Sequence, residues 1–437
     1  MHPAQKTNRH NYLLRILSAS LFWVFLISAI IRTIYYSTLL GTRQVDTASY
    51  INYHANILRG QTEALRTPVY PYFIKFIALF GTGNLINNIA TVQIIISYLF
   101  IILFYKTIRS ILKIRWLVIA ASLLYGAMLP IINFDKVVIT ESLSVSYMVL
   151  FMYLIAGYLH TPKKSRAIIL TLSVFIAIML RPSFIYLLPL TAAFWFFRLI
   201  VIRSERKACI AGLSASAMVI ILLIGYAYLN QRNFGFNGIS VVTNNNQMAV
   251  ITKAGLYNNG NDPEISNAIK NNFRQLHKKI VPKDSLINVM VKFDHERIHK
   301  FLLNCMLNQK GAYAAHIYGV VTSLQNENIF TDYAIHKSTT LAYKVDDIEY
   351  SVFRINFMFL YLFLGLCLAL VIVKWLKTKQ LPWFILFLWL ISIAQIAVAI
   401  IGGYDEYQRL IVAAIPALII LLFVCIDELW NVLRSPM

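Results

Sequence analysis

Long apolar stretches recur along almost the whole chain and are separated by short polar segments. A helix needs about 20 predominantly apolar residues to cross a bilayer. Runs near or above that length predict ten transmembrane helices, at residues 14–38, 87–105, 116–134, 138–159, 166–181, 183–201, 208–229, 353–373, 382–401 and 409–430. The pattern therefore predicts an all-α polytopic membrane protein. The boundary between the fifth and sixth helices is the least distinct, because only "RPS" at 181–183 separates them.

The composition agrees with an integral protein of a lipid bilayer. Hydrophobic residues make up 58% of the chain and charged residues only 14%, against about 25% charged residues in soluble domains. The formal net charge is +21, but the Lys and Arg residues are spread over alternate short loops, so no nucleic-acid partner is expected. Because basic loops are retained on the cytoplasmic side, both termini are expected in the cytoplasm.

Two segments on the outer side are long enough to carry chemistry, residues 39–86 and residues 231–352. They divide the chain into three parts. Residues 1–230 form a transmembrane module with the first outer loop, 231–352 a mainly helical outer subdomain, and 353–437 a C-terminal transmembrane module. The outer subdomain opens with an Asn- and Gly-rich stretch whose composition favours turns, and one interpretation is that it helps to shape an acceptor site.

The first outer loop has an amphipathic pattern typical of a helix at the membrane interface. On a helix that begins near Asp46 and continues past Leu58, Asp46, Tyr50 and Tyr53 fall on one face. Asp46 is then either an acid on an aromatic polar face or the N-cap of this helix, a position that favours Asp. The two prolines of "RTPVYP" at 66–71 break regular helix and predict the start of a second interfacial segment.

Several ionisable residues lie at the outer ends of predicted spans, where charge is costly and indicates function. They are Asp135, Lys136, Glu141, Arg181, Asp405, Glu406 and Arg409. All are predicted on the same membrane face as Asp46. One carboxylate with several arginines at a lipid boundary suits sugar transfer from a polyprenyl phosphate, because the phosphate leaves as a stable anion that needs only positive charge to receive it. The carboxylate then acts as general base on the acceptor hydroxyl.

The order of these motifs resembles the membrane glycosyltransferases of the GT-C class. A first span is followed by "DTASYINYHANILRG" and "RTPVYPYFI", then by "ITESL", by "LRPS" at a span boundary, and by a final "YQRLIVAAIPALIILL". The sequence is most similar to the bacterial dolichyl-phosphate-mannose-protein mannosyltransferase-like group, family 39, which includes the aminoarabinose transferases. The resemblance covers roughly two-thirds of the chain, and residues 231–352 contribute almost nothing to it.

The resemblance implies an inverting, single-displacement transfer of a sugar from a polyprenyl-phosphate donor to a glycan, lipid or protein acceptor. The reaction would take place at the outer face of a bacterial inner membrane. Asp46 is the implied base, and Arg181 and Arg409 hold the donor phosphate. The implied substrate cavity contains Tyr50, Arg66, Tyr70, Asp135, Glu141, Tyr404 and Glu406.

One departure from the family concerns metal dependence. Many relatives carry paired acids in the first outer loop, whereas Asp46 is followed by Thr47. Because a lone Asp is a poor site for a divalent cation, such a cation is possible but unsupported, and no metal ligands or other cofactor are assigned.

Three other functions match parts of the sequence. A polyprenyl-linked glycan polymerase or ligase also combines many spans with a large outer loop. A lipid or solute transporter is less favoured, because the ionisable residues avoid the span centres and no inverted repeat is evident. "HERIH" at 295–299 matches the H-E-x-x-H pattern of zinc peptidases, with His295 and His299 as ligands and Glu296 as base. Its charged neighbours and the lack of a marked third ligand favour an ordinary solvated helix.

Overall fold

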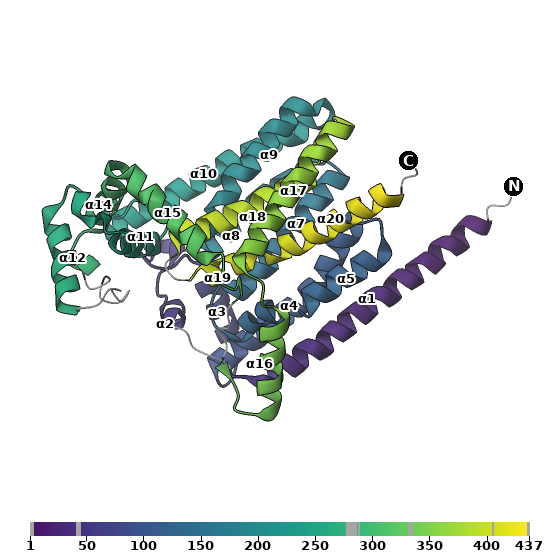
Figure 1. The fold of residues 1–437 in the computed structure, drawn as a ribbon, viewed down its shortest axis with the longest axis horizontal. Coiled ribbons are helices and arrows are strands. Elements are labelled where there is room, and N and C mark those ends of the chain that lie inside the picture. The colour runs from purple at the N-terminus through teal and green to yellow at the C-terminus, as the bar shows by residue number, and fades with distance from the viewer. Residues whose placement is uncertain are drawn as a thin grey trace.

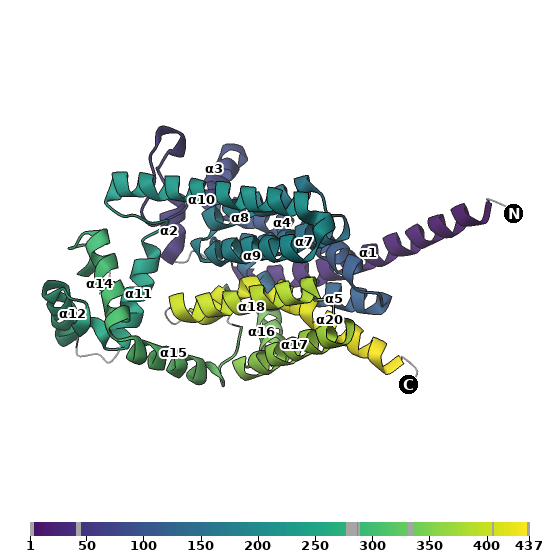
Figure 2. The same cartoon turned by 90° about the horizontal axis from the view of Figure 1, so that it is seen from above.

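The computed structural model describes residues 4–40, 45–276, 286, 289–330, 335–403 and 406–434. Within these residues the architecture is helical, apart from one short antiparallel pair between β1 (Leu39–Leu40) and β2 (Ile335–His336). Figure 1 shows the long helices running side by side as a bundle. The start of α1 and the end of α20 lie at one end of the bundle, and α11, α12 and α14 lie at the other (Figures 1 and 2).

Eight helices of the described residues are long and apolar enough to cross a membrane, and a bent pair makes up to nine. Five of the eight lie within a single helix each: α1 (Ala4–Thr38), α4 (Leu85–Ile111), α7 (Glu141–His160), α17 (Phe357–Thr378) and α18 (Trp383–Gly402). The other three combine two elements: η3 (Pro182–Tyr186) with α9 (Leu187–Val201), η4 (Arg203–Glu205) with α10 (Arg206–Phe234), and α19 (Tyr407–Ile411) with α20 (Ile415–Arg434). The predicted fifth span is α8 (Lys164–Leu180), which at 17 residues falls just short of the length required. The predicted all-α polytopic membrane fold is confirmed.

The predicted third span is broken. Its halves, α5 (Arg115–Gly126) and the segment Leu129–Lys136, are inclined by 43° to each other. The segment consists of α6 (Leu129–Ile132) and η2 (Asn133–Lys136). Gly126 ends the first half where α1 comes close, since a Cβ there would lie 2.0 Å from the Ser28 hydroxyl oxygen. The second half carries Asp135 into the protein, where the residue is 1% exposed.

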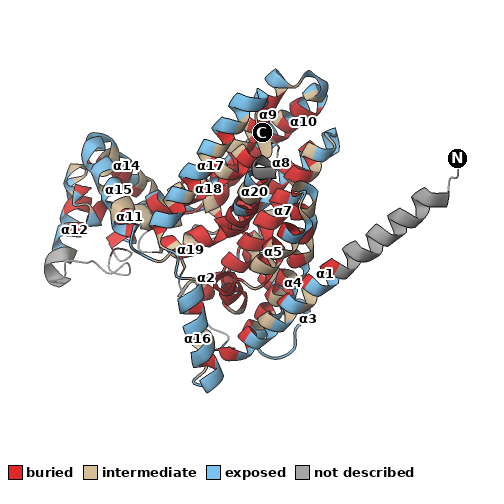
Figure 3. Cartoon of the chain, turned by 45° about the vertical axis from the view of Figure 1, so that its right-hand side comes forward, coloured by how far each residue is buried: buried red, intermediate tan, exposed pale blue. Residues whose placement is uncertain are grey.

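Helix α7 forms the centre of the bundle and determines where the site begins. It packs against α4, α8 and α20, and Figure 3 shows buried residues along most of its length. Its first residue, Glu141, is completely buried. The charged N-terminus of α7 therefore lies inside the protein, at the end of the bundle that carries the first outer loop.

The first outer loop contains three short elements: α2 (Val45–Ile51), η1 (Ile57–Arg59) and α3 (Val69–Phe80). The prediction of one helix from Asp46 past Leu58 is wrong in its length, because α2 ends at Ile51. The Glu63 carboxylate accepts hydrogen bonds from the backbone N–H groups of His54 and Ala55, and these contacts replace the continuation of the helix. As predicted, a second segment starts at the prolines, and α3 begins directly after Pro68.

The outer subdomain contains α11 (Val242–Lys253), η5 (Leu256–Asn259), α12 (Pro263–Leu276), α14 (His295–Asn308), α15 (Lys310–Leu324) and α16 (Thr340–Val352). Helices α11, α12 and α14 share a separate apolar core that includes Met248, Ile269 and Phe301. The later helices return to the spans: α15 packs on α18, and the Tyr35 hydroxyl of α1 donates to Glu349 of α16 at 2.6 Å.

Candidate active site

Arginines and carboxylates from distant parts of the chain meet at the N-terminal end of α7. In α2, the Oδ1 atom of Asp46 accepts a hydrogen bond from Nη2 of Arg66 at 2.5 Å. The Oδ2 atom accepts one from Nη2 of Arg409, in α19, at 2.8 Å. Each carboxylate oxygen of Asp46 therefore faces one guanidinium, so the predicted base and one predicted phosphate-binding residue are in direct contact.

Glu141 provides the buried half of this cluster. Its Oε1 atom accepts a hydrogen bond from Nη2 of Arg181 at 3.0 Å and another from Nε of Arg409. The Glu141 side chain is fully buried, and Arg181, which follows the last residue of α8, is only 7% exposed. Because a buried charge is costly unless it is paired, these three residues depend on one another to remain ionised at this depth.

Arg409 is the residue that joins the two halves. Its Nη2, Nε and Nη1 atoms face Asp46, Glu141 and Glu406 respectively, the last at 3.2 Å. A guanidinium presents its donors in a fixed planar fork, whereas a lysine has only a compact ammonium. Arg409 can therefore contact three carboxylates in one plane, and no other cationic side chain could replace it without loss of contacts.

Aromatic side chains form one wall beside Asp46. The Arg66 guanidinium lies over the Tyr50 ring, 4.2 Å from its centroid, and its Nη1 atom donates to the Tyr50 hydroxyl at 3.0 Å. The Tyr50 ring packs edge-to-face on the Tyr70 ring, with centroids 4.9 Å apart. The Tyr70 hydroxyl in turn donates to Oε1 of Gln93, in α4, at 2.7 Å. The structure thus brings the predicted residues Tyr50, Arg66 and Tyr70 together with Asp46.

The charges around Asp46 determine its protonation. Burial alone would raise the pKa of the Asp46 carboxyl, but the guanidiniums of Arg66 and Arg409 outweigh it and hold that pKa well below its usual range. Burial raises the pKa of the Tyr50 hydroxyl, so this phenol stays neutral. At neutral pH Asp46 is therefore a carboxylate whose two oxygens each accept a hydrogen bond from a guanidinium.

Arg181 retains an unused hydrogen-bond donor. Its Nη1 atom is buried and has no hydrogen-bond partner among the residues that the structure describes. A buried donor without a partner costs roughly 1–3 kcal/mol. A hydrogen-bond acceptor could satisfy this donor without breaking the contact between Arg181 and Glu141.

Asp135 lies in a second buried network next to this cluster. Its Oδ2 atom accepts a hydrogen bond from the Tyr36 hydroxyl at 2.6 Å, and its Oδ1 atom accepts one from the Ser142 hydroxyl at 2.5 Å. Arg32 of α1, also fully buried, lies 3.6 Å away. The structure therefore gives the Asp135 carboxylate a cationic partner of its own and links it to Ser142, the neighbour of Glu141 in the chain.

Sequence analysis missed Arg32 and Gln93. Arg32 is an isolated charge within the first apolar run, and an ionisable residue inside a span is itself a signal of a buried partner. Gln93 carries no such signal, although it accepts from Tyr70 and donates to the backbone oxygen of Asp135 at 3.1 Å. Of the predicted cavity residues, Tyr404 lies outside the described part of the chain.

"HERIH" forms the first turn of α14, where Arg297 and His299 have side-chain partners, whereas Nδ1 of His295 and Oε2 of Glu296 are buried with no hydrogen-bond partner among the described residues. Asp294 caps the helix and accepts from the backbone N–H of Glu296 at 2.8 Å. Arg297 pairs with Asp262 and Glu264, each at 2.6 Å, and Nδ1 of His299 lies 3.2 Å from Oδ1 of Asn244. No group of three His, Cys, Asp or Glu residues that could hold a metal ion occurs in the described ranges.

No protein-family model and no curated protein matches the sequence. Solved structures of the oligosaccharyltransferase from Archaeoglobus fulgidus do match. The apo form is 12% identical with a TM-score of 0.48, covering 96% of this chain and 52% of that chain. The archaeal oligosaccharyltransferase AglB, from the same organism and in complex with an inhibitory peptide and a dolichol-phosphate, is 13% identical with a TM-score of 0.49, covering 98% and 52%.

The chain thus spans about half the length of these archaeal proteins. The matching structures are of oligosaccharyltransferases. At this identity and TM-score, however, the likeness says nothing about substrate or mechanism. The function proposed below therefore depends on this chain's own residues.

Proposed function

We propose that the protein is an inverting glycosyltransferase that moves a sugar from a polyprenyl-phosphate donor to an acceptor hydroxyl at the outer face of the membrane. The observation that carries this proposal is the contact of Arg409 with both Asp46 and Glu141. It joins a candidate base to phosphate-binding guanidiniums at the end of a bundle of membrane helices. A polyprenyl phosphate supplies the two features that such a site matches, an anion and a lipid chain.

Donor binding would activate the base. The donor phosphate takes hydrogen bonds from Arg409 and from the unused Nη1 atom of Arg181, and it competes with Asp46 for the Arg409 guanidinium. As Arg409 turns toward the phosphate, the pKa of Asp46 rises toward its ordinary range, because the opposite charge that lowered it has moved away. The carboxylate then has a free oxygen that can accept a proton.

Transfer is then a single displacement. The acceptor oxygen forms a bond to the anomeric carbon from the side opposite the phosphate, and the bond between that carbon and the phosphate oxygen breaks. The proton of the acceptor hydroxyl passes to Asp46. The polyprenyl phosphate leaves as an anion stabilised by Arg181 and Arg409, so no acid is needed to protonate it.

The remaining residues would hold these groups in position. Glu141 contacts both Arg181 and Arg409, so it keeps them in place while Asp46 is released. Tyr50 and Tyr70 are buried and pack against each other beside the cluster, and Arg66 retains one contact to Asp46. Glu406, the most exposed of the three carboxylates, with 39% of its side chain accessible, would contact the acceptor.

We also propose that the termini face the cytoplasm of a bacterium and the cluster faces outward across the inner membrane. The basic loops predict the cytoplasmic side. The start of α1 and the end of α20 lie at the end of the bundle away from α11, α12 and α14 (Figure 1), an arrangement that this topology requires.

A direct test compares wild type with Asp46→Asn in membranes supplied with a panel of radiolabelled polyprenyl-phosphate sugars. Wild type should transfer label to endogenous acceptors from at least one donor, and Asp46→Asn should lose nearly all transfer at matched expression. Asp346→Asn, on the exposed face of α16, controls for loss of an acidic residue elsewhere. If Asp46→Asn transfers label at the wild-type rate, a polyprenyl-linked polymerase or ligase that uses the outer subdomain becomes the better assignment.

A further inference from the structure

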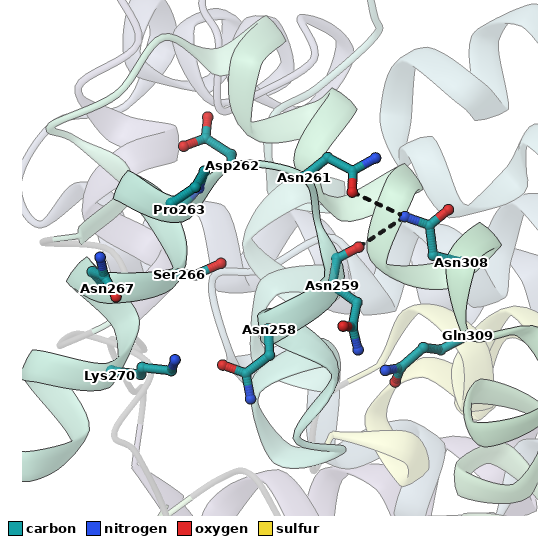
Figure 4. Close-up of a pocket in the computed structure, with 10 residues that line it drawn as sticks. All are labelled: Asn258, Asn259, Asn261, Asp262, Pro263, Ser266, Asn267, Lys270, Asn308 and Gln309. Carbon is teal, nitrogen blue, oxygen red and sulfur yellow. Dashed lines mark hydrogen bonds between the residues drawn. The ribbon is translucent and has the colours of Figure 1, made fainter.

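The outer subdomain carries a polar pocket of about 420 Å³ (Figure 4). It is formed by the loop after η5, by the first turns of α12 and by the junction of α14 with α15. Five of its ten lining residues are asparagines and a sixth amide comes from Gln309. This concentration of amides lies apart from the arginine cluster and has no role in the reaction described above.

The loop that forms the pocket is held rigidly on α14. Nδ2 of Asn308 donates to the backbone oxygen of Asn259 at 2.9 Å, and Arg297 pairs with Asp262 through two hydrogen bonds of 2.6 and 3.0 Å. Gly260 lies so close to the core that a Cβ would come within 2.2 Å of the Phe301 ring. The pocket is therefore preorganised, which lowers the entropic cost of binding a ligand.

Several side chains in this rigid frame keep their hydrogen-bonding groups free. Asn258, Asn267 and Lys270 are exposed, and their side chains, like that of Gln309, have no hydrogen-bond partner among the described residues. In Figure 4, Lys270 and Asn258 point toward one another across the opening. Each free amide offers two donor hydrogens and an acceptor oxygen, so the pocket presents both kinds of group at short spacing.

The composition of the pocket selects the class of ligand. An anion would find a single cation in the lining, Lys270, among six amide side chains. A metal ion would have only the Asp262 carboxylate, which Arg297 already occupies, and a nucleobase would find no aromatic side chain in the lining. Neutral sugars carry adjacent hydroxyls that both donate and accept, and amide side chains match this arrangement.

We propose that this pocket binds a neutral segment of glycan outside the transfer site. The inference rests on the proposed glycosyltransferase function, since it makes the outer subdomain the part of the protein that holds a glycan acceptor. Binding there would raise the local concentration of the acceptor near the arginine cluster. It would also explain why the amides are gathered in a region to which the resemblance with known glycosyltransferases does not extend.

The test measures binding without turnover, on full-length purified Asp46→Asn protein and an array of immobilised neutral and acidic oligosaccharides. We expect binding to at least one neutral glycan, and a loss of about tenfold or more in affinity in the Asn258→Ala, Asn267→Ala double variant. Tenfold corresponds to about 1.4 kcal/mol, roughly the net contribution of one or two hydrogen bonds. Asn271→Ala, four residues beyond Asn267 and outside the lining, should bind normally. Because the substituted residues are exposed, the thermal unfolding midpoint should not change.

Selective binding to acidic glycans, absence of glycan binding, or unchanged binding by the double variant would each overturn this inference. None of these results bears on the role of Asp46, which the transfer assay measures separately. Conversely, a failed transfer assay would leave a positive glycan-binding result intact. The two failures are therefore distinguishable.

Discussion

Arg409 and Asp46 are 363 residues apart in the sequence, yet Nη2 of Arg409 lies 2.8 Å from Oδ2 of Asp46. Arg66 and Arg181 add two further positive charges, and Glu141 and Glu406 two further negative ones. The three arginines and three carboxylates therefore give the cluster a formal net charge of zero before any ligand binds. A phosphate adds negative charge, so one carboxylate must lose a partner. Asp46 is the better candidate than Glu141, because 30% of its side chain is accessible and none of the Glu141 side chain is.

Substitution of Arg409 by lysine should reduce transfer severely. A lysine retains the charge but loses the planar fork that contacts Asp46, Glu141 and Glu406. We expect kcat/KM to fall by roughly 100-fold, as for loss of one preorganised donor to a developing anion. Initial rates, measured with a donor that wild type uses in the transfer assay, report the effect. Arg232→Lys, at an exposed position in the last turn of α10, is the control, and equal effects of the two variants would contradict the assignment.

Neutralising Glu141 should destabilise the protein. Glu141→Gln leaves Arg181 and Arg409 without their buried carboxylate, and breaking a buried pair costs about 3–5 kcal/mol. The thermal unfolding midpoint in detergent should fall by several degrees. The double variant Arg181→Met, Glu141→Gln should have a higher unfolding midpoint than Glu141→Gln alone, because it lacks one of the unpaired charges. If the two substitutions were simply additive, the residues would not be coupled as the 3.0 Å contact indicates.

The hydrophobic pattern predicted ten spans, of which eight, or nine with the bent pair, are long and apolar enough among the described residues, because length and apolarity are local properties of a sequence. The convergence of Asp46, Glu141 and Arg409 was an expectation based on topology and family resemblance. Their contacts depend on the packing of α2, α7 and α19, which no local signal specifies. The early end of α2 was missed for the same reason, since Glu63 replaces helical hydrogen bonds from twelve residues beyond Ile51. The break between α5 and α6 was equally hidden within one apolar run.

Asp135 should support the fold more than it supports chemistry. It pairs with Arg32 and accepts from Tyr36 and Ser142, and the structure shows no contact between it and Asp46. Asp135→Asn leaves Arg32 buried beside a neutral amide, so the free energy of unfolding should fall by about 3–5 kcal/mol. The folded protein should retain kcat within a few-fold of wild type. A large loss of kcat without loss of stability would instead place Asp135 in the substrate cavity.

The histidines of "HERIH" should be dispensable for transfer. His299 contacts Asn244, and neighbouring Arg297 is committed to Asp262 and Glu264. We expect His295→Ala to transfer sugar at the wild-type rate and elemental analysis of purified wild type to find no stoichiometric zinc. Retention of one zinc per chain that is lost on His295→Ala would revive the metallopeptidase interpretation.

The pH dependence of transfer should reveal a different pKa of Asp46 in the free enzyme and in the donor complex. In the free enzyme, Arg66 and Arg409 hold the pKa of Asp46 well below its usual range, so Asp46 remains ionised on acidification. Because kcat/KM reports groups of the free enzyme, it should stay level down to about pH 4, the ordinary aspartate pKa. In the donor complex the phosphate draws Arg409 away, the pKa of Asp46 rises, and kcat should begin to fall at a higher pH than kcat/KM. If kcat and kcat/KM fall at the same pH, donor binding does not release Asp46, and the proposed activation step is wrong.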